Sequence, residues 1–84
     1  MWILQEANPG VPVKQGGVKV AGFSYEGYAS PLHHCMLKDE HGNIVFETYG
    51  SPELTPVDKH FEPIWLYGLT LEDLESGRVV VTTL

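Results

Sequence analysis

Cysteine is nearly absent from this chain, because Cys35 is the only one among 84 residues. A single thiol cannot form an intramolecular disulfide, so the fold must depend on its apolar core. Such scarcity is typical of proteins kept in a reducing compartment, and we predict a cytoplasmic location. The start of the chain also lacks the basic and apolar regions of a signal peptide, so we expect no secretory leader.

Long hydrophobic runs and basic residues are missing too. No apolar stretch approaches the roughly 20 residues needed to span a bilayer. Five Lys and Arg residues stand against eleven Asp and Glu residues, which gives a net charge of −6. Because that charge repels phosphates and anionic lipids, we expect neither nucleic acid nor a membrane as a partner. The acidity fits two roles, which are solubility and a surface for a basic partner.

The residues that are present indicate a small all-β domain. Hydrophobic residues make up 43% of the chain and aromatic residues 11%, so residues 1–84 can bury one modest core as a single domain. Turn signals recur about every ten residues, as is typical of small barrels and sandwiches. They include Asn8-Pro9-Gly10, Gln15-Gly16-Gly17, Glu26-Gly27, Ser30-Pro31 and Gly50-Ser51-Pro52. We predict a barrel or sandwich of five to six strands, either SH3-like or OB-like.

One segment has the pattern of a short helix before the last strand. Thr70 followed three residues later by Asp73 resembles a capping box, and Gly77 suits the position after a helix end. Residues 50–63 carry three prolines and no clean alternation, which predicts a long loop. The strand candidates are residues 2–5, 18–25, 64–69 and 79–84, together with the two arms of a hairpin.

The hairpin spans residues 32–49. Asp39 opens turns by accepting amide hydrogens, and Gly42 suits the left-handed position of a three-residue loop. This loop pairs Lys38 with Ile44 and then continues without interruption. The predicted core face is Leu32, His34, Met36, Ile44 and Phe46, and the opposite face is His33, Cys35, Leu37, Val45, Glu47 and Tyr49.

The run His33-His34-Cys35 suggests either metal binding or nucleophilic chemistry. His33 and Cys35 share a strand face, but His34 points away, and His41 lies at the hairpin tip. None of the usual paired ligand spacings is present, and no third group that would orient a nucleophile can be identified. We therefore predict no metal site, no cofactor and no catalytic residue, and expect the protein not to be an enzyme.

The aromatic residues are the best candidates for binding. Trp65 and Tyr67 share one strand face, Tyr25 and Tyr28 flank the Glu26-Gly27 turn, and Tyr49 ends a strand. The strand from Ile64 to Tyr67 has no polar face, so it is either covered on both sides or completes an interface. We predict a protein-binding or assembly module, such as an acidic accessory subunit or inhibitor, with a protein partner or a homo-oligomer. The alternatives are a small-ligand or carbohydrate-binding module and, third, an enzyme that uses Cys35.

Overall fold

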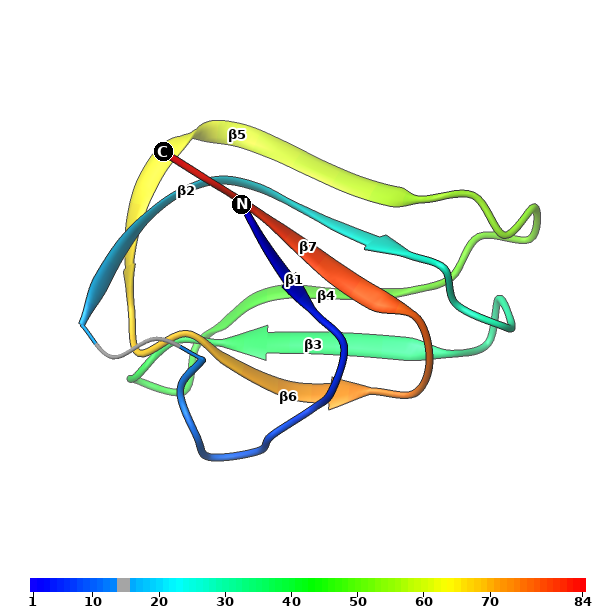
Figure 1. Ribbon diagram of the computed structural model, residues 1–84, viewed down its shortest axis with the longest axis horizontal. Helices are drawn as coiled ribbons and strands as arrows, with labels where there is room; N and C mark the ends of the chain where they lie inside the picture. The colour runs from blue at the N-terminus through cyan, green and yellow to red at the C-terminus, as the bar shows by residue number, and fades with distance from the viewer. Residues whose placement is uncertain (14–15) are drawn as a thin grey trace.

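The protein is described here by a computed structural model that covers residues 1–13 and 16–84. Two sheets contain all the strands of these ranges (Figure 1). The four-stranded sheet has the order β1-β7-β2-β5 and the three-stranded sheet the order β4-β3-β6. The strands are β1 (Trp2–Leu4), β2 (Gly17–Glu26), β3 (His34–Lys38), β4 (Ile44–Tyr49), β5 (Val57–Tyr67), β6 (Thr70–Leu74) and β7 (Arg78–Thr83).

The all-β prediction is confirmed, but the prediction of a short helix is wrong. Thr70 to Leu74 form strand β6, which pairs antiparallel with β3. A segment this short is not helical unless packing stabilises it. Here the packing favours a strand, because Leu71 is fully buried and lies opposite Leu37 of β3. Seven strands are present instead of five or six, and across the described residues they do not close into a barrel.

The prediction of a long loop over residues 50–63 is also wrong in its second half. Strand β5 begins at Val57 and runs through Pro63 to Tyr67. Proline is tolerated there because β5 lies at the edge of its sheet, where the missing N–H costs no bond to a second neighbour. The turn predicted at Gln15-Gly16-Gly17 falls partly on Gln15, which lies outside the described residues.

A single hydrophobic cluster joins the two sheets. Phe23 of β2 stacks on Phe46 of β4, with ring centroids 5.2 Å apart, so the contact crosses from one sheet to the other. Val79 and Val81 of β7 are fully buried in the same cluster. The core therefore lies between the sheets, and the outer sheet faces are left for solvent or partners.

The hairpin turn has the predicted geometry. Gly42 adopts a φ of 80°, and the Asp39 carboxylate accepts hydrogen bonds from the amides of His41 (2.9 Å) and Asn43 (3.0 Å). Lys38 pairs with Ile44, as expected. Asp39 is thus a turn-forming residue whose role is structural.

Beyond Ile44 the predicted register is wrong. A bulge places Phe46, and not Val45, opposite Leu37, so every later pair is shifted by one residue. Cys35 and Leu37 are fully buried, whereas Ile44 is half-exposed. The predicted core face is therefore correct for Phe46 but reversed along β3.

A second irregularity explains the imperfect alternation of residues 18–25. The register of β2 shifts between Val20 and Gly22 against both of its neighbours. Val18 and Val20 point inward before the shift, and Phe23 and Tyr25 point inward after it. An uninterrupted period of two cannot place both pairs in the core, which is why the sequence pattern looked ambiguous.

Candidate functional site

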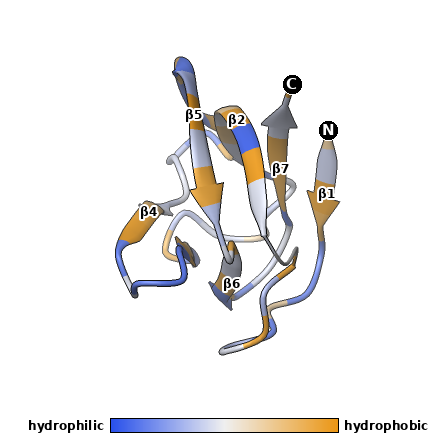
Figure 2. Cartoon of the chain, turned by 90° about the vertical axis from the view of Figure 1, so that its left-hand side faces the viewer, coloured by the Kyte–Doolittle hydropathy of each residue, from blue (hydrophilic) through white to orange (hydrophobic). Residues whose placement is uncertain are grey.

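Two exposed aromatic side chains near the end of β5, those of Trp65 and Tyr67, form what we call the β5 aromatic surface. Their exposed fractions are 59% and 49%. The rings of Trp65 and Tyr67 lie nearly parallel, with centroids 6.5 Å apart and an interplanar angle of 24°. Figure 2 looks onto the end of the molecule where β5 bends and shows hydrophobic residues along this strand.

Gly17 makes room for the two rings. Gly17 lies on the neighbouring strand β2 and pairs with Tyr67 of β5. A Cβ atom at Gly17 would lie 2.6 Å from Cε1 of Tyr67 and 3.2 Å from Cε3 of Trp65. The rings therefore rest against the backbone of β2, which orients them while leaving their outward faces exposed.

The other predicted binding residues do not join this surface. Tyr49 is 61% exposed but lies on β4 of the other sheet, with its ring centroid 4.8 Å from that of His34. Tyr25 and Tyr28 are buried and stack on each other, with centroids 4.6 Å apart. Because both rings are buried, they offer no face that a partner could contact.

Tyr28 has a clear structural role instead. Its hydroxyl donates to the carbonyl of Thr55 and accepts a hydrogen bond from the amide of Ser51 at 2.7 Å. These bonds tie the segment before β5 to the core. Tyr25 fills the centre of the core with no exposed surface.

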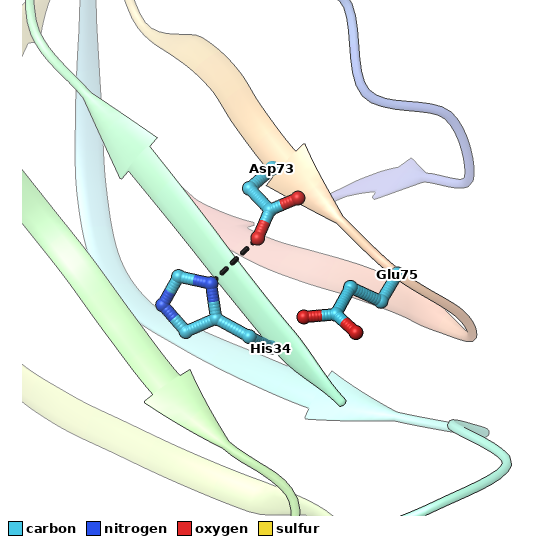
Figure 3. A group of neighbouring side chains, drawn as sticks. All are labelled: His34, Asp73 and Glu75. Carbon is cyan, nitrogen blue, oxygen red and sulfur yellow. Dashed lines mark hydrogen bonds and ion pairs between the residues drawn. The ribbon is translucent and has the colours of Figure 1, made fainter. Parts of the chain in front are cut away.

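A second group of polar side chains lies on the outer face of the three-stranded sheet; we call it the His34 cluster, and it comprises His34, Glu47, Asp73 and Glu75. Nδ1 of His34 lies 2.6 Å from Oδ2 of Asp73, and Nε2 lies 2.9 Å from Oε2 of Glu47. His34 on the central strand thus bridges carboxylates from both neighbouring strands. Figure 3 shows the Asp73 and Glu75 carboxylates on the same side of the His34 ring.

The backbone fixes Glu75 beside His34. Met36 pairs with Asp73, and the amide of Glu75 donates to the carbonyl of His34 at 3.1 Å. Residues opposite each other in an antiparallel pair share a face, so the side chains of His34 and Glu75 emerge together. One donor atom from each of His34, Asp73 and Glu75 can be chosen so that all three lie within 4.8 Å of one another.

The electrostatic environments of His34 and Cys35 differ. Partial burial of His34 lowers its pKa, but hydrogen bonds to Asp73 and Glu47 outweigh that effect and the net pKa is raised. Burial raises the pKa of the Cys35 thiol to about 12. At neutral pH the thiol is therefore protonated and has no exposed surface, which is the usual state of a structural cysteine.

Sequence reasoning placed His34 in the core and therefore missed this cluster. The signal that could have found it is the alternation Asp73-Leu74-Glu75, in which two acidic residues flank an apolar one, as in a strand with one polar face. His33, which was grouped with Cys35, instead places Nδ1 2.6 Å from the hydroxyl of Ser76. The structure thus separates His33 from Cys35 and brings His34 together with acidic residues.

No enclosed pocket is present in residues 1–13 and 16–84. The same ranges contain no helix with the length and apolar character that crossing a membrane requires. Comparison with protein-family models, with curated proteins and with solved structures found no match to this chain.

Proposed function

We propose that this protein is a non-catalytic binding or assembly module whose protein partner docks on the β5 aromatic surface. The observation that supports this most is the stacked pair Trp65 and Tyr67, each about half exposed on an edge strand. Tryptophan and tyrosine supply large contact areas at low entropic cost, which is why they dominate binding hot spots.

The edge position adds a second source of affinity. An edge strand has backbone N–H and C=O groups with no neighbour on one side, and a partner strand can pair with them. Pro63 interrupts this row of donors within β5. The segment that follows it, Ile64 to Leu66, combines this edge with apolar side chains, and at Tyr67 the backbone carbonyl accepts a hydrogen bond from the amide of Glu40 at 2.8 Å.

The charge of the chain favours a partner with a basic rim. A net charge of −6 steers a basic surface toward the protein and repels an acidic one. An acidic accessory subunit or inhibitor is therefore the concrete form that we propose, acting in the cytoplasm.

Capture of partners from the native source tests this proposal. We expect the wild-type chain to retain a specific protein, and Trp65→Ala and Tyr67→Ala to lose it while keeping a native circular dichroism spectrum. Ile44→Ala is the matched control, because Ile44 is 53% exposed but lies on the other sheet. Equal capture by all variants would contradict a role for the β5 aromatic surface.

A homo-oligomer is the self-associating form of the same proposal. Two copies could pair their β5 edges, as in other strand-mediated dimers. Static light scattering of the isolated chain distinguishes the two forms: a dimer that Trp65→Ala converts to a monomer supports self-association. A strict monomer at high concentration would exclude self-association, and the proposed partner would then be a different protein.

A carbohydrate or small-ligand module is the second candidate. The parallel rings of Trp65 and Tyr67 favour it, because such a pair can stack against a flat ligand. The version that used Tyr25 and Tyr28 has no exposed rings to support it. Quenching of tryptophan fluorescence by oligosaccharides, absent in Trp65→Ala, would favour this candidate over a protein partner.

An enzyme that uses Cys35 is the third candidate and has the weakest support, since the buried thiol has a pKa of about 12.

For the architecture we propose the sandwich form of the predicted fold. Its support is the stacking of Phe23 on Phe46 across the two sheets.

A further inference from the structure

We propose that the His34 cluster binds one divalent transition-metal ion, with His34, Asp73 and Glu75 as ligands and Glu47 orienting the His34 ring. This site lies on the opposite sheet from the β5 aromatic surface and does not depend on the proposed function. It shares no residue with the pair His33 and Cys35.

The spacing and origin of the donor atoms support a site. Imidazole nitrogen and carboxylate oxygens from His34, Asp73 and Glu75 lie within 4.8 Å of one another. Two adjacent strands and the residue that follows β6 supply them, so the sheet itself fixes their backbone positions. Rigid elements position ligands better than loops do.

The hydrogen bond to Glu47 supplies the outer carboxylate that a metal-binding histidine ordinarily has. A ligating imidazole usually donates its other N–H to a carboxylate or a carbonyl. Here Nε2 faces Oε2 of Glu47 at 2.9 Å, which leaves Nδ1 as the nitrogen that faces Asp73. When the metal binds Nδ1, imidazolium releases one proton from that nitrogen to solvent, and the Nε2 proton stays in its bond to Glu47.

The charge balance of the cluster also favours a cation. Three acidic side chains, those of Glu47, Asp73 and Glu75, surround one imidazole, and no lysine or arginine of the described chain forms an ion pair with any of them. The Asp73 and Glu47 side chains are 40% and 44% exposed, so an ion can reach them from solvent. A dication offsets most of the negative charge that three acidic side chains bring together.

The ligand types indicate which cation. One imidazole with two carboxylates suits Zn²⁺ and its first-row neighbours better than Ca²⁺ or Mg²⁺, which prefer oxygen alone. Tetrahedral ligands about 2.0–2.2 Å from the metal lie about 3.3 Å apart. The 2.6 Å separation of His34 Nδ1 and Asp73 Oδ2 must therefore widen, which the half-exposed Asp73 side chain permits.

Calorimetric titration of the untagged full chain with ZnCl₂ tests the proposal. We expect one equivalent to bind, with affinity reduced at least tenfold in Asp73→Asn and in Glu75→Gln. Glu47→Gln should reduce affinity by about 10- to 100-fold, as loss of an outer-shell partner does. Glu75→Gln should disturb the fold least, because the Glu75 side chain is exposed. His41→Gln and His60→Gln are controls that should bind zinc as the wild type does.

Ring nitrogen NMR shifts give a readout independent of affinity. Zn²⁺ should shift Nδ1 of His34 and leave Nε2 protonated, and an excess of Mg²⁺ should not reverse the change. Absence of binding, or a loss of binding in the His41 or His60 variants equal to that in the cluster variants, would overturn the proposal. So would a metal-dependent shift confined to Nε2 of His34.

Discussion

At the scale of single residues, Cys35 illustrates how burial decides chemistry. Its side chain lies in the core between the sheets, and burial raises the pKa of its thiol to about 12. The same residue in an exposed position would be a reactive thiol with an ordinary pKa. Its neighbours His33 and His34 point to other partners, Ser76 and two carboxylates, so adjacency in sequence does not create a site.

The reactivity of Cys35 provides the first prediction. At pH 8, where free thiols react readily, we expect a disulfide-exchange reagent to label the native protein at least about a hundredfold more slowly than the urea-unfolded chain, because labelling requires opening of the core. The labelling rate followed by absorbance checks this. A native rate close to the unfolded rate would mean that β3 exposes the face now assigned to the core.

Asp39 provides a prediction about pH. Desolvation tends to raise the pKa of Asp39, but hydrogen bonds from the Asn43 backbone and side chain and from the His41 backbone together outweigh it, and the net pKa is lowered. A lowered folded-state pKa means that the contribution to stability is present above the unfolded value, about 3.9, and is lost as pH falls through the folded value. The wild type should therefore lose more stability than Asp39→Ala when urea unfolding is compared at pH 5 and at pH 2.5. Identical losses would show that the turn does not depend on the Asp39 charge.

At the scale of elements, the irregular pairings account for most of what the sequence could not predict. The turn at Asp39 and Gly42 was predictable because side-chain chemistry at a turn is local. The bulge after Ile44 was not, because an extra residue in one strand is stabilised by contacts with the opposite sheet, such as Phe46 on Phe23. Strand β6 was missed for the same reason, since Leu71 and Leu74 fit both a helix and a strand until β3 is beside them.

The bulge predicts a contrast between two neighbouring residues. Phe46→Ala should destabilise the protein by about 3–4 kcal/mol, because the ring is 5% exposed and stacked on Phe23. Ile44→Ala should cost less than about 1 kcal/mol, because Ile44 is half-exposed. Urea unfolding measures both values. Similar losses of unfolding free energy in the two variants would contradict the bulge and support the uninterrupted register, in which Ile44 and Phe46 share the core face.

At the scale of the whole molecule, the two sheets divide the surface into unlike faces. The edge of the four-stranded sheet carries the β5 aromatic surface, and the outer face of the three-stranded sheet carries the His34 cluster. Trp65 and Tyr67 were predicted as binding residues from residue type alone, and their exposure fits that use. Tyr25 and Tyr28 have the same residue type but are buried. Tyr25 faces inward because of the register shift in β2, and Tyr28, which follows β2, stacks on the Tyr25 ring.

The central claim is that Trp65 is a contact residue and not part of the core. Its most direct test compares the unfolding free energies of Trp65→Ala and Phe23→Ala, since Phe23 is 1% exposed and Trp65 is 59% exposed. Full truncation of a core aromatic costs about 3–5 kcal/mol, so we predict that value for Phe23→Ala and about 1–2 kcal/mol for Trp65→Ala. Equal losses for the two variants would place Trp65 in the core and contradict the proposed docking surface.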